Sequence, residues 1–124
     1  MRIAVLDDSQ NIGEMLQQYL ELEGHTVVVY YSPSKFLVNI IEPTTVSTPF
    51  DLMIVDLFLS EGMSGGAVIQ QVRNIFPDLP AILISADSTW EIEAARRGSP
   101  PVRVLRKPFS MATLLAMIRE LKGE

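Results

Sequence analysis

The sequence predicts an α/β fold, in which one parallel sheet of five strands is covered by helices on both faces. Two observations predict it. Short, continuous apolar runs, typical of strands buried on both faces, recur along the chain. Between successive runs lie segments with apolar residues at helical spacing. Strands that alternate with helices in this way favour parallel pairing through right-handed crossovers.

The first strand is expected over residues 3–6, and a helix follows it. Ser9 or Asp8 supplies the N-cap of this helix, and Gly24 ends it. The apolar residues on one face of the helix are Ile12, Met15, Leu16, Tyr19 and Leu20.

A β-branched and aromatic segment over residues 27–31 predicts the second strand. Ser32 then offers an N-cap, and Pro33 occupies the first position of a second helix that runs to about Ile41. Segment 42–50 contains two prolines and several turn-forming residues, which predicts a flexible loop.

The third strand is expected over residues 52–55 and ends at Asp56. Residues 62–66 are rich in glycine and predict a loop before the third helix, which stops at Pro77. The apolar stripe of that helix comprises Val68, Ile69, Val72, Ile75 and Phe76.

The fourth strand is expected over residues 81–84. Residues 88–91 have the spacing of a capping box and open a fourth helix that ends before Gly98. The fifth strand follows over residues 102–105, and Ser110 caps the last helix. Its apolar residues are Leu114, Leu115, Ile118 and Leu121.

Composition narrows the class of protein. A chain of 124 residues with 48% hydrophobic content predicts a single domain, residues 1–124. The net charge of −5 argues against direct binding of nucleic acid or anionic lipid. The chain has no cysteine, so disulfides and thiolate metal sites are excluded. No apolar run approaches the roughly 20 residues of a membrane span or the apolar core of a signal peptide, and we expect a cytoplasmic protein.

Polar residues follow four of the predicted strands, namely Asp7 and Asp8, Asp56, Ser85 and Lys107. Each alone is more typical of a turn or a strand end than of a binding site. In parallel sheets, however, ligands bind beyond the carboxyl ends of the strands. Three carboxylates, a hydroxyl and an amine carried to one edge of one sheet therefore predict a site.

The chemistry of these groups favours phosphoryl transfer. Crowded carboxylates repel one another, so they call for a cation or for raised pKa values, and oxygen ligands completed by phosphate suit Mg²⁺. Lys107 would contact a phosphoryl oxygen, and the hydroxyl of Ser85 would donate to another. Asp56 stands alone after its strand and is the best nucleophile, whereas Asp7 and Asp8 form a pair suited to holding metal.

These motifs resemble the response-regulator receiver family of two-component signalling, over the whole chain. They are Asp7-Asp8, Asp56, Ser85-Ala86 and Lys107-Pro108-Phe109, in this order on these strands. The resemblance implies a flavodoxin-like, doubly wound (βα)5 fold with strand order 2-1-3-4-5. It also implies that Asp56 accepts a phosphoryl group from a sensor histidine kinase or a phosphotransfer protein.

Further roles are implied by the resemblance alone. Asp8 would bind Mg²⁺ directly and Asp7 largely through water, while Asp56 and the backbone carbonyl of Phe58 would complete the metal site. Ser85 and Lys107 would contact the phosphoryl group, and the peptide bond between Lys107 and Pro108 is expected to be cis. The chain would catalyse only its own phosphorylation and dephosphorylation, and would not otherwise be an enzyme.

The sequence departs from the family pattern at several positions. Val104 stands where the family usually has an aromatic residue, and Ser99-Pro100-Pro101 lengthens the segment before the fifth strand. Both changes put in question the usual relay of the signal through that strand. Phe58 and Asp87 occupy positions that flank the attacking water in the family, and we expect the bulk of Phe58 to prolong the phosphorylated state.

Two alternative functions stay open at this point. Val104 and the Pro-Pro segment also suit a binding module of receiver fold that no longer depends on phosphorylation. The second alternative is an aspartate-nucleophile phosphohydrolase. Phe58 argues against it, because such an enzyme would normally carry a second aspartate at that position. No output domain follows the last helix, so we expect a stand-alone receiver or one domain of a longer protein.

Overall fold

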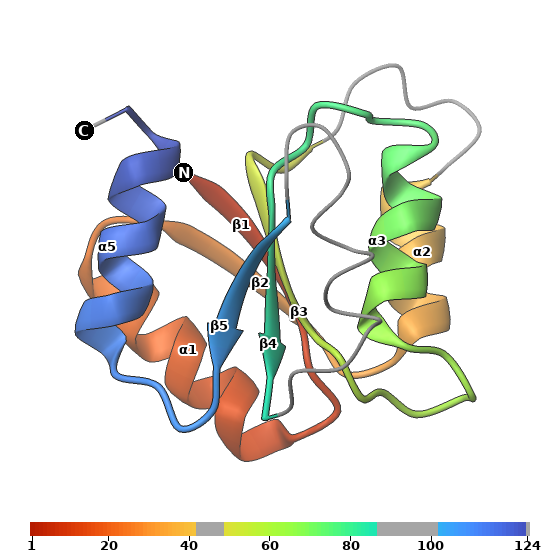
Figure 1. Cartoon of the computed structure of the whole chain (residues 1–124), viewed down its shortest axis with the longest axis horizontal. Helices are drawn as coiled ribbons and strands as arrows, with labels where there is room; N and C mark the ends of the chain where they lie inside the picture. Colours follow the sequence, from red (N-terminus) through yellow and green to blue (C-terminus); the bar gives the residue numbers. More distant parts are fainter. Residues whose placement is uncertain (42–48, 87–101, 124) are drawn as a thin grey trace.

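A five-stranded parallel sheet with the strand order β2-β1-β3-β4-β5 forms the centre of the molecule (Figure 1). The structure is a computed structural model that describes residues 1–41, 49–86 and 102–123. Within these ranges it confirms the predicted fold class, the parallel pairing and the strand order.

The elements lie close to where the sequence predicts them. The strands are β1 (Arg2–Leu6), β2 (Thr26–Tyr30), β3 (Leu52–Asp56), β4 (Ala81–Ser85) and β5 (Arg103–Arg106). The helices of the described ranges are α1 (Gln10–Leu22), α2 (Pro33–Ile40), α3 (Gly65–Arg73) and α5 (Met111–Leu121). None of these helices is long and apolar enough to cross a membrane. The fourth helix, with its capping box, and most of the loop predicted at 42–50 lie outside the described residues, as do Asp87 and the Pro-Pro segment.

Each of these four helices begins at a serine. The side chains of Ser9, Ser32, Ser64 and Ser110 accept hydrogen bonds from backbone N–H groups in the first turns of α1, α2, α3 and α5. Such caps satisfy donors that a helix leaves unpaired at its start. For α1, the cap is Ser9 and not the alternative, Asp8.

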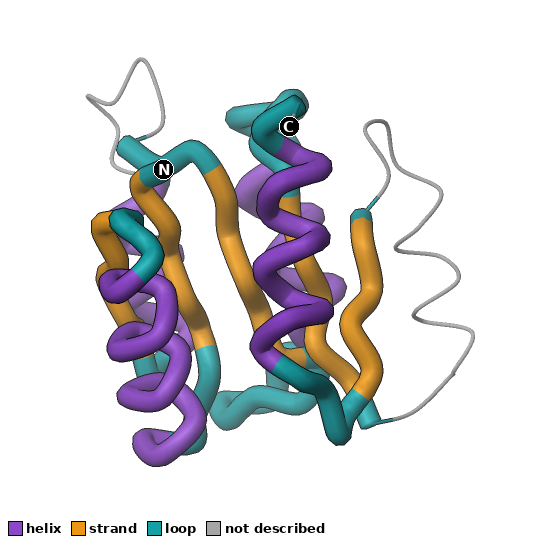
Figure 2. Tube along the Cα trace, turned by 90° about the vertical axis from the view of Figure 1, so that its left-hand side faces the viewer, coloured by secondary structure: helices purple, strands orange, loops and turns teal. Residues whose placement is uncertain are grey.

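The helices bury the two faces of the sheet in pairs. Helices α1 and α5 lie on one side of the sheet and α2 and α3 on the other, so the strands form a middle layer (Figures 1 and 2). The first pair packs Leu16, Leu20, Leu114 and Ile118 against the sheet, and the second pair packs Phe36, Ile40, Val68 and Val72. Because β1, β3 and β4 are covered on both faces, their residues are nearly all buried, as the continuous apolar runs predict.

The third helix differs from its prediction at both ends. Gly65 and Gly66 belong to α3 and not to the preceding loop, because Ser64 caps the helix directly before them. The helix ends at Arg73, before Phe76, although the N–H of Phe76 still donates to the Val72 carbonyl. A residue that precedes a proline is disfavoured in the helical region, so this last turn unwinds before Pro77.

Candidate functional site

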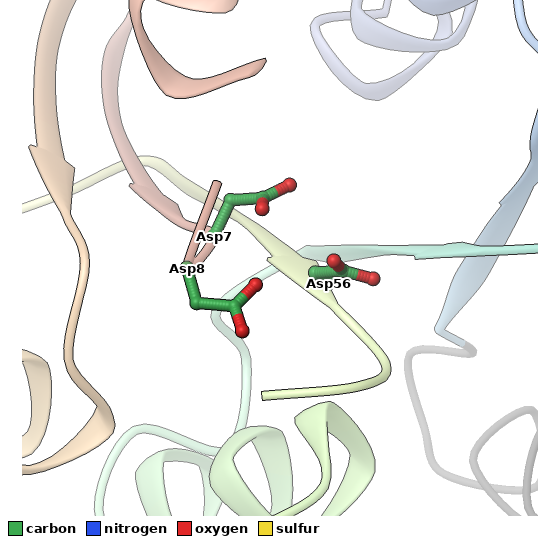
Figure 3. Close-up of side chains that lie close together, drawn as sticks. All are labelled: Asp7, Asp8 and Asp56. Carbon is green, nitrogen blue, oxygen red and sulfur yellow. The ribbon is translucent and has the colours of Figure 1, made fainter. Parts of the chain in front are cut away.

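The three predicted carboxylates meet at the carboxyl edge of the sheet (Figure 3). Asp7 and Asp8 directly follow β1, and Asp56 is the last residue of β3, the neighbouring strand. One oxygen from each carboxylate lies within 4.8 Å of the others. Asp7 and Asp56 are buried, whereas Asp8 is exposed. The prediction that these residues cluster is therefore confirmed.

Asp7 is held in place by the local backbone. Its N–H donates to the carbonyl of Tyr30 (3.1 Å), which extends the β1–β2 ladder by one residue. Its Oδ1 accepts from the N–H of Ser9 (2.9 Å), and this contact turns the chain into α1. Its Oδ2 is buried and, among the described residues, has no hydrogen-bond partner. A buried carboxylate oxygen without a partner is costly, so this atom is suited to a cation.

The pKa of the Asp7 carboxyl group is raised by its burial and by neighbouring carboxylates. Burial raises the pKa of its carboxyl group, and the negative charges of Asp56 and Asp8 raise it further. The Ser9 N–H and the positive charge of Lys107 lower this pKa but do not reverse the shift. A divalent cation among these carboxylates would relieve both the repulsion and the loss of hydration.

Lys107 brings a positive charge to Asp56. Its Nζ lies 3.3 Å from Asp56 Oδ2, and the two side chains are 28% and 8% exposed. The N–H of Lys107 donates to the carbonyl of Ser85 (2.8 Å), which keeps the chain after β5 beside the end of β4. Ser85 is fully buried at that end. The peptide bond between Lys107 and Pro108 is cis, as expected, and Arg106 is exposed.

The loop between β3 and α3 returns tightly to Asp56. Phe58 pairs with Ser64 in an antiparallel bridge, and the N–H of Gly65 donates to the Leu57 carbonyl at 2.6 Å. The carbonyl of Leu57, and not that of Phe58, accepts this hydrogen bond. A Cβ atom on Gly65 would lie only 2.1 Å from the carbonyl oxygen of Asp56. Only glycine therefore allows the start of α3 to approach the end of β3 so closely.

These groups suit one kind of chemistry. Three carboxylates offer hard oxygen ligands, of which one buried atom has no other partner, and such ligands fit Mg²⁺. Beside them, an ammonium group contacts a buried carboxylate at an edge where ligands of parallel sheets bind. The arrangement can bind a divalent cation together with an anion such as phosphate.

Comparison with known proteins identifies the family of the chain. A model of the response regulator receiver domain matches residues 3–119. The chain belongs to this family. It is thus a receiver domain of the kind found in two-component response regulators, and the resemblance read from its motifs is confirmed.

The curated relatives are longer than this chain. The response regulator MprA of Mycobacterium ulcerans is 28% identical over 121 residues, which are 98% of this chain and 50% of that protein. The chain spans only 24% to 52% of the length of the first curated relatives that it matches.

Solved structures show the same fold. A two-component response regulator from Clostridium difficile has a TM-score of 0.85 at 19% identity, with 100% of this chain and 97% of that chain covered. A CheY-like receiver domain protein from Methanospirillum hungatei also has a TM-score of 0.85, at 24% identity, with 98% and 94% covered.

The sequence patterns did not indicate the contacts of two residues in the loop between β3 and α3, Gly65 and Glu61. Gly65 was expected only as part of a loop, because the pattern of glycines does not show which one meets another backbone. Glu61 was not singled out, although it joins the loop after β3 to α2. The neighbouring Gly62 was a signal for a turn, but no local pattern shows what a side chain at its tip will contact.

Proposed function

We propose that Asp56 of this receiver domain accepts a phosphoryl group in a Mg²⁺-dependent reaction. The observation that carries the proposal is the contact of Lys107 Nζ with Asp56 Oδ2, at 3.3 Å, inside a cluster of three carboxylates. A carboxylate nucleophile needs a neutralised surrounding before an anionic phosphoryl group can approach it. Catalysis of phosphoryl transfer rests mainly on such positioning and charge neutralisation.

The proposed metal ligands are Asp7, Asp8, Asp56 and the backbone carbonyl of Phe58. The unpartnered Oδ2 of Asp7 supports this assignment, because a cation, directly or through a bound water, would give that buried oxygen the partner that it lacks. The Phe58 carbonyl lies in the bridge that folds the loop back on β3. When bound, Mg²⁺ would neutralise the negative charge of phosphoryl oxygens and help to orient the phosphoryl group toward the nucleophile.

In the proposed reaction, a carboxylate oxygen of Asp56 attacks the phosphorus of a phosphohistidine. A P–O bond forms, the P–N bond breaks, and the imidazole leaves with its electron pair and takes a proton from solvent. Lys107 contacts Asp56 in the structure and would hold a phosphoryl oxygen after the reaction. The buried hydroxyl of Ser85 would donate to another. Attack of water on phosphorus would later release phosphate and restore the carboxylate.

The donor in this proposal is a sensor histidine kinase or a phosphotransfer protein, and the receiver domain would act in the cytoplasm. Apart from its own phosphorylation and dephosphorylation, the chain would catalyse no reaction. It would signal by a shift between two conformations. Val104 packs partly buried against the core shared with α2 and α3, where the family's usual aromatic residue would otherwise stand. We therefore propose that the signal depends less on the rotation of a side chain of β5 than is usual in the family.

Acetyl phosphate with Mg²⁺, followed by intact mass, tests the proposal. The wild type should gain one phosphoryl group, and Asp56→Asn should gain none. Asp51→Asn is a matched control, since Asp51 is exposed and directly precedes the first residue of β3, at the end of the strand opposite to Asp56. A side-chain oxygen of Asp51 accepts from the Arg2 N–H, and asparagine also offers such an oxygen. This variant should be phosphorylated like the wild type. An unmodified wild type, or a modified Asp56→Asn protein, would refute the proposal.

A further inference from the structure

The loop between β3 and α3 has a well-anchored base and a separate contact at its tip. At the base, the N–H of Leu57 donates to Ile84 of β4 (2.9 Å), and the N–H of Gly65 donates to Leu57. At the tip, Glu61 and Gly62 both have left-handed backbones, with φ of 63° and 70°. Glycine adopts this conformation readily, whereas glutamate does so at a cost. A glutamate at such a position calls for a compensating contact.

That contact crosses to another element. The hydroxyl of Ser32 donates to Glu61 Oε1 at 2.5 Å, although the two residues lie 29 positions apart. Ser32 is the N-cap of α2, and its Oγ also lies 3.0 Å from Ser34 Oγ. The carboxylate of Glu61 therefore sits at the start of α2, where the helix presents unpaired N–H groups and partial positive charge. Figure 1 shows the loop after β3 and the start of α2 at the same end of the sheet.

The acidity of Glu61 agrees with this position. Hydrogen bonds from the hydroxyls of Ser32 and Ser34 lower the pKa of its carboxyl group, and the backbone N–H of Ser34 and the charge of Lys35 act in the same direction. Glu61 is exposed, so water competes for the carboxylate. The hydrogen bonds from Ser32 and Ser34 favour the ionised form of Glu61.

We infer that Glu61 is a positioning residue for the metal site: by binding Ser32 at the start of α2, it holds the loop that presents the Phe58 carbonyl. The inference rests on the proposed function, which assigns that carbonyl to Mg²⁺. Phe58 lies three residues before Glu61 and is bridged to Ser64 at the base of the loop. This bridge holds one side of Phe58, and the contact of Glu61 at the tip restricts the backbone on the other side, so that the Phe58 carbonyl keeps one direction.

The experiment measures the affinity of the full chain for Mg²⁺ by titration calorimetry. Glu61→Ala removes the contact and keeps a side chain at the left-handed position. Glu61→Gly also removes the contact but relieves the backbone cost, so its fold is not in question. Glu120→Gln is the matched control, since Glu120 is an exposed glutamate of α5 that pairs with Arg103. This substitution changes the net charge by one, as each Glu61 variant does.

The dissociation constant for Mg²⁺ should rise about tenfold in both Glu61 variants and stay near the wild-type value in Glu120→Gln, because residues that orient metal ligands act on affinity by such factors. At saturating Mg²⁺, acetyl phosphate should modify the Glu61 variants as it does the wild type. A dissociation constant near that of the control in either variant, or a loss of phosphorylation at saturating Mg²⁺, would overturn the inference. The proposed function fails separately, if the wild type itself is not modified at Asp56.

Discussion

Gly65 offers the sharpest test of how the fold builds the site, through the substitution Gly65→Ala. A Cβ atom at this position would lie 2.1 Å from the carbonyl oxygen of Asp56, 2.8 Å from its carbonyl carbon and 3.0 Å from the Cα of Leu57. All three are backbone atoms, so no side chain can rotate away. The backbone after Asp56 is itself held, because the N–H of Leu57 donates to the carbonyl of Ile84.

The displacement that alanine requires follows from these distances. Real Cβ atoms essentially never approach another heavy atom within 3.0 Å, so the start of α3 and the end of β3 must separate by at least 0.9 Å, the difference between 3.0 and 2.1 Å. Overpacking of this kind costs about 1–3 kcal/mol. The separation also weakens the hydrogen bond from Gly65 to Leu57, which adds about 1 kcal/mol. Alanine returns about 0.5–1 kcal/mol through its helix propensity, which leaves a net loss of about 1–3.5 kcal/mol.

Gly66→Ala provides the control at the next position of the same helix. There the nearest atom to an added Cβ is Ser64 Oγ, at 3.9 Å, so alanine has room. This variant should be as stable as the wild type or up to about 1 kcal/mol more stable. Urea denaturation followed by circular dichroism measures both free energies of unfolding.

Phosphorylation supplies a second measurement on the same pair of proteins. Because the shift at Gly65 acts on the backbone of Asp56, Gly65→Ala should slow modification by acetyl phosphate, by as much as about a hundredfold for a displacement near 1 Å. Gly66→Ala should react at the wild-type rate. Equal stabilities and equal rates in the two variants would refute the close approach and the reasoning built on it.

Three further predictions concern the charged groups and the mouth of the site. In metal-free solution, Asp7→Asn should raise the free energy of unfolding, because the raised pKa of Asp7 means that its ionised form is unfavourable in the folded protein. The gain in stability should therefore grow as pH rises above the ordinary carboxyl pKa of 3.8. Denaturation experiments across pH in which this gain shrinks would contradict the prediction. Lys107→Met should slow phosphorylation of Asp56 at least about tenfold, since a charge-assisted hydrogen bond contributes about 1.5–3 kcal/mol. Arg106→Gln, which changes the exposed neighbouring residue, should be phosphorylated at the wild-type rate. Equal rates in the two variants would count against the role of Lys107. Phe58→Asn should shorten the lifetime of the phosphorylated protein, followed by loss of the mass adduct after the donor is removed, and an unchanged or longer lifetime would show that Phe58 does not hinder water.

The sequence predicts much of this fold because its signals are local. Continuous apolar runs identify strands such as β3 and β4, which are buried on both faces, and serine caps identify the starts of α2 and α5. Once the strands are known to be parallel, their carboxyl ends must share one edge, which is why Asp7, Asp56 and Lys107 could be assigned to one site. The strand order came from the resemblance of these motifs to a family and is confirmed by the pairing of the strands.

Local patterns were less reliable where tertiary packing decides. Tyr19 lies on the predicted apolar face of α1 but is 49% exposed, because helical spacing shows which residues share a face and not how wide the covered stripe is. The helix α3 also begins earlier than its apolar pattern predicts, directly after the Ser64 cap, and it ends earlier, at Arg73.

The sequence by itself thus determined the class of fold, the edge at which the site lies and the chemical groups that meet there. Only the tertiary structure decided which oxygen of Asp7 lacks a partner, which glycine faces the Asp56 backbone, and that Glu61 reaches the start of α2. The physical reason is that the apolar patterns of strands and helices, and the caps of helices, involve residues close in sequence. Contacts between loops instead depend on differences of a few tenths of an ångström in the distance between atoms. These distances are set only when the helices have packed on the sheet.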